Sequence, residues 1–139
     1  MNVTIFIDGG SRGNPGPAAA GIVILNTDTN QPVLEAGYFL GRATNNFAEY
    51  QGLIRSLRAA LDRGATHATI HSDSELMVRQ VLGQYKVKSP DLQPLHREAT
   101  ALLRQLQQFK IGHVYRESNQ RADQLVNAAL DAQHDVVYT

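Results

Sequence analysis

The chain has 139 residues and no cysteine, a size that suits one domain over residues 1–139 and a composition that excludes disulfides and thiolate metal sites. Thirteen basic and thirteen acidic side chains cancel, so a polyanionic partner must be bound by a local patch or through metal ions. No apolar run is long enough to span a bilayer and no signal peptide is visible, so we expect a cytoplasmic protein without membrane contact.

Three strands are predicted in the first 40 residues. In the first strand, Val3, Ile5 and Ile7 alternate with Thr4, Phe6 and Asp8, which is strand spacing. Residues 18–25 form an apolar run, and residues 32–40 follow a turn-forming cluster. Short connections predict that these strands form an antiparallel meander. The first strand ends at Asp8, and a loop rich in glycine and proline follows it as far as Pro17.

Helices and strands alternate in the rest of the chain. Apolar spacing predicts a helix over residues 47–61, with Asn45 or Asn46 as its cap and Gly64 at its end. A strand over 68–71 and a short helix follow, with Ser72 and Glu75 at capping-box spacing. An amphipathic helix over 92–109, a strand over 111–115 and a last helix over 119–132 complete the pattern. The tail, residues 134–139, is either an edge strand or disordered.

This order predicts an α/β fold. Strands that are joined by helices form right-handed parallel crossovers, so the fourth and fifth strands should be parallel. We therefore expect a mixed five-stranded sheet, with an antiparallel meander of strands one to three and helices on both faces.

Four acidic residues are predicted to meet at one rim of this sheet. Asp8 and Asp73 follow the ends of two strands, where sites gather in open α/β sheets. Glu49 and Asp123 lie early in two helices, next to the apolar stripe of each. Taken singly, the acids could serve as a turn residue, a helix cap, a partner of the helix dipole or a solvated edge residue.

Together, four carboxylates repel one another, and a divalent cation relieves that repulsion. Oxygen ligands without cysteine favour Mg²⁺, with Mn²⁺ as the alternative. Two such ions about 3.5–4 Å apart could stabilise the attacking and leaving oxygens of a phosphoryl displacement. The residues themselves therefore point to metal-dependent hydrolysis of a phosphodiester.

Four motifs resemble those of the ribonuclease HI family. They are residues 8–17 (DGGSRGNPGP), Thr44-Asn45-Asn46 with Glu49, Ser72-Asp73-Ser74, and residues 119–123. The chain is most similar to the compact archaeal and bacterial subgroup, which lacks a basic protrusion. The resemblance implies the RNase H fold and endonucleolytic hydrolysis of the RNA strand of RNA/DNA hybrids, giving 5′-phosphate and 3′-hydroxyl ends.

The resemblance also implies roles for individual residues. Asp8 would bridge two Mg²⁺ ions, Glu49 and Asp73 would complete the shell of one, and Asp123 would complete the shell of the other. Gly10 and Ser11 would approach the RNA backbone, Asn14 and Asn45 would lie in the minor groove, and Thr44 would contact a DNA phosphate. The remaining matched contact positions are Asn46, Ser74 and Glu75.

Arg116 stands where the subgroup has an arginine and the best-known members of the family have a histidine. We expect it to replace that histidine, with an ordinary surface arginine as the alternative. An arginine cannot be a general base at neutral pH, so its part in the catalytic site would be charge stabilisation or a phosphate contact.

Two other functions remain open from the sequence. The chain could be a non-catalytic module that binds a duplex through the same fold, although four costly carboxylates argue against that. The same chemistry could also act mainly on double-stranded RNA or on RNA–DNA junctions. We expect the protein to be a monomer.

Overall fold

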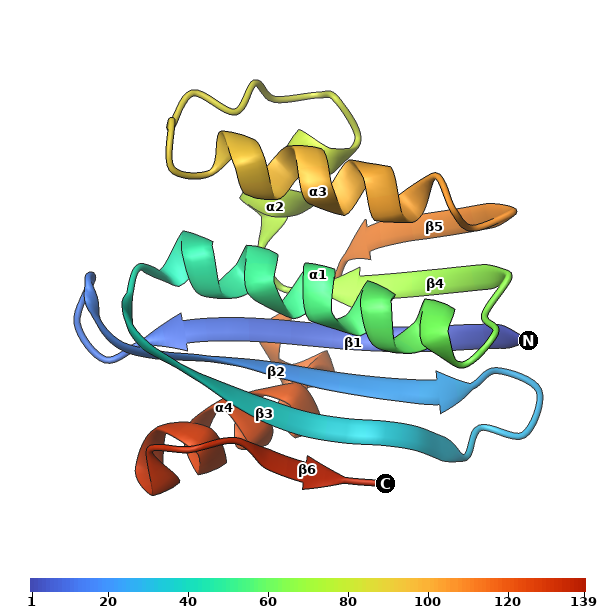
Figure 1. Ribbon diagram of the computed structural model, residues 1–139, viewed down its shortest axis with the longest axis horizontal. Helices are drawn as coiled ribbons and strands as arrows, with labels where there is room; N and C mark the ends of the chain where they lie inside the picture. Colours follow the sequence, from blue (N-terminus) through green and yellow to red (C-terminus); the bar gives the residue numbers. More distant parts are fainter.

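The computed structural model describes residues 1–139 and contains one mixed six-stranded sheet in the order β5–β4–β1–β2–β3–β6 (Figure 1). The strands are β1 (Asn2–Ser11), β2 (Gly16–Asn26), β3 (Pro32–Ala43), β4 (His67–Ser72), β5 (Gln108–His113) and β6 (Val136–Tyr138). β1 to β3 pair antiparallel, whereas β4 pairs parallel with both β1 and β5. The predicted α/β class and mixed sheet are confirmed, but the expected number of five strands is wrong.

The sixth strand comes from the C-terminal tail. Residues 136–138 pair antiparallel with residues 35–37 on the outer edge of β3. The Asp135 carboxylate accepts a hydrogen bond from the backbone N–H of Phe39 at 2.8 Å, next to this pairing. Of the two alternatives for the tail, the edge strand is therefore the observed one, and it covers backbone groups that would otherwise be an open sheet edge.

Helices cover both faces of the sheet, as predicted. α1 (Asn45–Asp62) and α3 (Gln93–Leu103) lie over one face, and α4 (Gln120–Ala132) lies under the other (Figure 1). The short α2 (Glu75–Val81) and the 3₁₀ turn η1 (Arg116–Ser118) connect these layers to the sheet. None of these helices combines the length and the apolar character that crossing a membrane requires.

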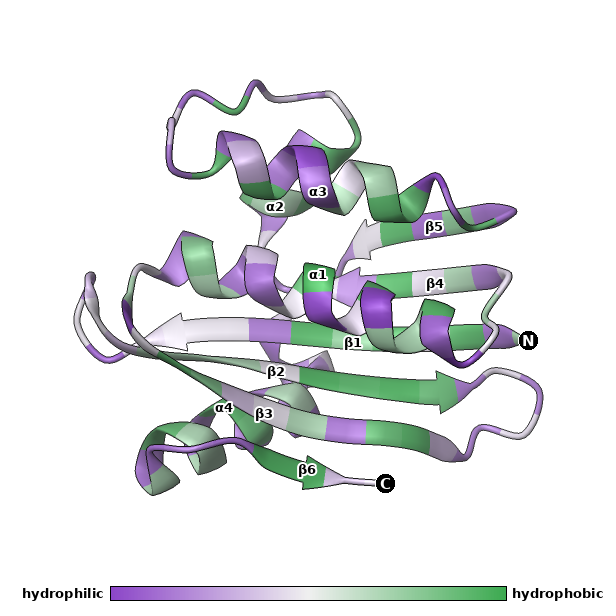
Figure 2. Cartoon of the chain, viewed as in Figure 1, coloured by the Kyte–Doolittle hydropathy of each residue, from purple (hydrophilic) through white to green (hydrophobic).

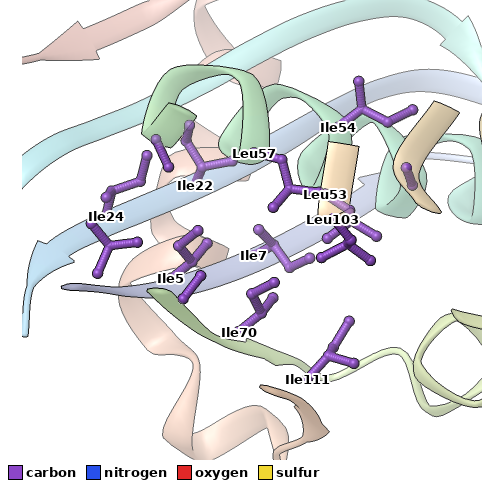
Figure 3. Close-up of a cluster of buried hydrophobic side chains, with 14 of the residues drawn as sticks. Ile5, Ile7, Ile22, Ile24, Leu53, Ile54, Leu57, Ile70, Leu103 and Ile111 are labelled. Atoms are coloured by element: carbon purple, nitrogen blue, oxygen red, sulfur yellow. The ribbon is translucent and has the colours of Figure 1, made fainter. Parts of the chain in front are cut away.

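The main core lies between the sheet and α1. Ile5 and Ile7 alternate with Phe6 along β1 and are fully buried, because every second side chain of a strand points to the same face. Figure 3 shows these isoleucines facing Leu53 and Leu57 of α1. Figure 2 shows the hydrophobic part of β1 followed by one hydrophilic band and a nearly neutral arrowhead, so the core ends where Asp8 begins the rim.

A smaller apolar cluster holds α4 against the other face. It consists of four buried residues, Ala19, Val126, Ala129 and Leu130. α4 approaches the sheet closely because β2 and β3 carry glycines there: a Cβ on Gly21 or on Gly37 would lie 2.2 Å from a backbone oxygen of the helix. These two glycines therefore set the depth at which α4 sits.

Several boundaries differ from the predictions. β1 continues past Asp8 to Ser11, because its pairing with β2 extends to the last residue of the strand, and β5 covers 108–113 instead of 111–115. The amphipathic helix predicted over 92–109 ends at Leu103, and Phe109 belongs to β5, because a turn buries Leu106 and continues the apolar spacing beyond the helix. Thr44, and neither Asn45 nor Asn46, caps α1 by accepting the N–H of Phe47.

The start of α2 also differs from the predicted capping box. Ser74 caps α2 by accepting the N–H of Met77, whereas the Ser72 hydroxyl accepts the N–H of Ser74. The cap therefore lies two residues later than Ser72, because Ser72 is still the last residue of β4 and is fully buried there.

Candidate active site

Asp8 and Asp73 lie at the same edge of the sheet because β1 and β4 are parallel neighbours. Asp8 is in the last third of β1, opposite Gly21 of β2, and only 7% of it is exposed. Asp73 follows Ser72, the last residue of β4, which pairs with Ile7. Parallel pairing of the two backbones therefore places both carboxylates at the same edge of the sheet.

Glu49 joins them because α1 rests directly on the backbone of β1. A Cβ on Gly9 would lie 2.4 Å from the backbone of both Ala48 and Glu49, so only glycine permits this approach. Glu49 is 9% exposed, and its Oε2 is buried without a hydrogen-bond partner. A buried carboxylate oxygen of this kind is costly unless a cation or a proton satisfies it.

One carboxylate oxygen from each of Asp8, Glu49 and Asp73 lies within 4.8 Å of the other two. Burial, and then the Asp73 charge, raise the pKa of Asp8 to about 8, although the backbone N–H of Gly9 donates to its Oδ1 at 2.9 Å. Burial, followed by the Asp8 and Asp73 charges, raises the pKa of Glu49 well above its usual range. The trio is thus a cluster of oxygens that disfavours its own ionisation and could bind a divalent cation.

Asp123 lies on α4, near this trio but outside it. Its charge contributes to the raised pKa of Asp8, after burial and Asp73. Arg116 in η1 approaches it from the solvent side, with 3.9 Å between Arg116 Nη2 and Asp123 Oδ1. The Arg116 side chain is 80% exposed, so the guanidinium is free to meet a ligand over the acids.

A groove runs from Asp8 along the near face of α4. It is lined by the loop after β1, by the start of α1, by α4 and by Arg116, and its lining residues include Gly10, Ser11, Arg12, Asn45, Asp123 and Asn127. The sequence singled out all of these except Arg12 and Asn127. Gly10 adds no side chain to the wall of this groove.

Asn14 and Asn45 connect the two sides of the groove at its rim. Asn14 Oδ1 accepts the N–H of Asn45 at 3.1 Å, and Asn45 Oδ1 accepts the N–H of Ser11 at 2.7 Å. The Ser11 hydroxyl donates to the Ala43 carbonyl at 2.8 Å. Both amide oxygens are therefore used within the protein, while neither Nδ2 group donates a hydrogen bond inside it.

The other predicted contact residues lie away from this groove. Thr44 and Ser74 cap helices, and Glu75 forms an ion pair with Arg79 at 2.9 Å. Asn46 lines a separate hollow beside the loop between α2 and α3. These residues lie near the two helix N-termini that frame the acidic trio, but the structure does not join them to one surface with Asp8.

Asn119 supports the site but was not singled out as a site residue from the sequence. It is almost fully buried, and its Nδ2 donates to the carbonyl of Ile7 at 2.8 Å, which ties the start of α4 to the residue before Asp8. The sequence placed it at the start of the last predicted helix and in the matched motif 119–123, without a role of its own. No sequence pattern could indicate the contact, because 112 positions separate the two residues.

Comparisons with family models and with solved structures agree on the family to which this chain is similar. A family model described as "Reverse transcriptase-like" matches residues 6–129. RNase H1 of the archaeon Halobacterium salinarum has a solved structure that is 44% identical, covers 95% of this chain and 99% of that one, and superposes with a TM-score of 0.91. LC11-RNase H1, solved in complex with an RNA/DNA hybrid, is 38% identical with a TM-score of 0.88, covering 94% of this chain and 98% of that one.

A curated relative in Mycobacterium tuberculosis is longer than this chain. Bifunctional protein Rv2228c is 48% identical over 132 residues, which are 95% of this chain and 36% of that protein. This chain thus spans about a third of the length of the mycobacterial relatives that it matches.

Proposed function

The chain belongs to the ribonuclease HI family, and from this premise we propose that it hydrolyses the RNA strand of RNA/DNA hybrids. The products would carry 5′-phosphate and 3′-hydroxyl ends. The observation that carries this proposal is the trio of Asp8, Glu49 and Asp73, in which one carboxylate oxygen from each residue lies within 4.8 Å of the other two, at an open groove. A relative of the same fold binds an RNA/DNA hybrid, which favours that duplex as the substrate.

The donor set suits hard divalent cations. All four acids offer oxygen only, and one oxygen of Glu49 has no partner within the protein, so Mg²⁺ fits best and Mn²⁺ is the alternative. Asp8 would be shared by two ions, with Glu49 and Asp73 around one and Asp123 at the other. When bound, such ions lower the pKa of the attacking water and stabilise the leaving 3′ oxygen.

The protein's own groups would position the substrate. Asp8, Glu49 and Asp73 are carried by three different elements of the rigid sheet and α1, so their spacing is fixed before substrate arrives. Arg116 would contact the phosphate at the cut bond or offset its negative charge. It cannot accept a proton at neutral pH, so it does not act as the base.

The groove offers donors that suit a duplex. The unused Nδ2 groups of Asn14 and Asn45 are donors at the rim, and acceptor atoms are the groups that every base pair presents in the minor groove. Gly10 and Ser11 form a wall that the sugar–phosphate backbone can approach closely. Thr44 would contact a DNA phosphate. Further contacts with the duplex would come from Asn46, Ser74 and Glu75.

A labelled RNA/DNA hybrid incubated with and without Mg²⁺ tests this function. We expect the RNA strand to be cut only with the ion, and Asp8→Asn to lose cutting by several orders of magnitude. Asp28→Asn, a change at an exposed turn residue, is the matched control and should cut normally. Near-normal turnover by Asp8→Asn would refute the two-ion mechanism.

The same assay separates the alternative functions. Tight binding of the hybrid without any cutting would identify a non-catalytic binding module. Faster cutting of double-stranded RNA or of an RNA–DNA junction would change the main substrate and leave the chemistry in place. We also propose a monomer and a cytoplasmic location, which sedimentation and cell fractionation test.

A further inference from the structure

Arg12 occupies a place in the groove that the catalytic proposal does not use. It lies in the loop between β1 and β2 and lines the same groove as Asp8, Asp123 and Arg116. Together, Arg12 and Arg116 are the two cationic side chains of that groove. The backbone of a duplex carries a negative charge at every phosphate, so a cationic side chain in this groove could bind one of them.

The guanidinium of Arg12 is held from one side only. Its Nη2 donates to Asp131 Oδ1 at 2.7 Å and to Asn127 Oδ1 at 3.3 Å, both on α4. An arginine has five N–H donors, and the three on Nε and Nη1 find no acceptor within the protein. The side chain is 49% exposed. α4 thus fixes where the group lies and leaves most of its donors available.

Stability does not account for this arrangement. The side chain of Asp131 is also largely exposed, and ion pairs between exposed side chains contribute roughly 0–1 kcal/mol. The loop is already joined to the start of α1 through Asn14, Asn45 and Ser11. An added ion pair is therefore not required to hold the loop in place.

We propose that Arg12 binds a backbone phosphate of the strand in the groove, a few nucleotides away from the phosphate that is cut. This inference rests on the proposed function, because it takes the groove as the path of a nucleic acid strand. Asn127 and Asp131 follow Asp123 by one and two helical turns, which is about 6 and 12 Å along α4. Phosphates of one strand recur about every 3.4 Å along a duplex axis, so this separation corresponds to about two to four phosphates. Arg116 then lies nearer the cut phosphate, and Arg12 meets one farther along the same strand.

Asp131 then positions Arg12 but also opposes the ligand. Its carboxylate orients the guanidinium, yet its negative charge lies close to the phosphate that Arg12 would bind. Asp131→Asn keeps an oxygen that can accept from Nη2 and removes that charge. Phosphate binding by Arg12 therefore predicts effects of opposite sign for changes at the two partners of this ion pair.

The experiment compares Arg12→Ala and Asp131→Asn with wild type in hybrid cleavage at several salt concentrations. Arg12→Ala should raise KM about tenfold, as the loss of a charge-assisted hydrogen bond does, and change kcat less than about twofold. The slope of log affinity against log salt should fall by about one. Asp131→Asn should leave KM unchanged or lower it.

Arg58→Ala is the matched control. Arg58 is similarly exposed and forms an ion pair with Glu98 on the side of α1 that faces α3, so its loss removes the same charge far from the groove. It should leave KM and the salt slope unchanged. Equal effects of Arg12→Ala and Arg58→Ala would overturn the proposal, since net charge alone would then explain both.

A purely structural ion pair gives a different result. In that case Arg12→Ala and Asp131→Asn would both raise KM and both lower the melting temperature, and this would also overturn the proposal. Fluorescence anisotropy of a labelled hybrid without metal gives the same comparison without cleavage. A protein that binds but never cuts would refute the proposed function, while the effect of Arg12→Ala on binding would still decide this inference.

Discussion

Replacing Asp8 by asparagine should stabilise the metal-free protein, and the gain should grow with pH. Burial and the Asp73 charge raise the pKa of Asp8 from 3.8 to about 8. The folded state therefore holds a proton that the unfolded state releases between these two values. Asp8 contributes stability that is complete below about pH 4 and is lost as the pH rises through about 8.

The size of the effect follows from this linkage. One additional bound proton changes the free energy of unfolding by up to about 1.4 kcal/mol per pH unit. Between about pH 5 and about pH 8, wild type should lose roughly 2–4 kcal/mol that Asp8→Asn keeps. The raised pKa of Glu49 changes the free energy of unfolding with pH in the same direction, but Glu49 is present in both proteins. Burial lowers the pKa of His71, which has the opposite effect on the free energy of unfolding, again in both proteins.

Urea unfolding in EDTA across this pH range measures the difference. Asp28→Asn serves as the control and should follow wild type. Addition of Mg²⁺ should raise the melting temperature of wild type more than that of Asp8→Asn, because a ligand that binds only the folded state stabilises it. Parallel pH profiles for wild type and Asp8→Asn would refute the reasoning, since the carboxylate would then carry no unusual proton.

Three further changes test the packing around the site by the free energy of unfolding. Gly9→Ala should cost at least about 3 kcal/mol, because its Cβ would meet the backbone of α1 at 2.4 Å, whereas Gly10→Ala, with 3.6 Å to its nearest neighbour, should cost less than about 1. Tyr50→Phe should cost about 1–2 kcal/mol, because it leaves the buried Gln80 oxygen without the hydroxyl that donates to it at 2.6 Å. Asn119→Ala should cost about 1–3 kcal/mol and also lower the cleavage rate, and a stability loss without any rate loss would show that its contact with β1 does not position the acids.

The sequence predicted that four acids meet, and the proximity of Asp8, Glu49 and Asp73 could be predicted because simple geometry governs it. Asp8 and Asp73 directly follow Ile7 and Ser72, the last paired residues of two neighbouring parallel strands, and that brings them together. Glu49 could be placed beside the buried face of its helix from the angle of 100° per residue. These inferences depend on local periodicity and on strand order, both of which a sequence carries.

What the sequence could not predict depends on contacts between distant residues or on small energy differences. Arg12 meets Asp131 across 119 positions, and no local pattern encodes that pairing. Thr44 and Asn45 have similar capping preferences, so the cap that forms depends on how Asn45 is used by Ser11. The strand at residues 136–138 is too short to be distinguished from a disordered tail without the β3 edge that it covers.

Different elements of the fold hold the acidic trio and Asp123 in place. Asp8, Glu49 and Asp73 are held by β1, α1 and β4, and their spacing depends on Gly9. Asp123 instead moves with α4, whose depth is set by glycines in β2 and β3 and whose start is tied to β1 by Asn119.

Mutual repulsion favours separation of Asp123 from the trio, because the Asp123 charge disfavours an ionised Asp8. The close packing of α4 on the sheet resists that separation, since a helix seated on glycine backbones cannot shift outward without opening a gap. The packing therefore keeps Asp8, Glu49 and Asp73 together, with Asp123 near them on α4, at a cost to the stability of the metal-free protein.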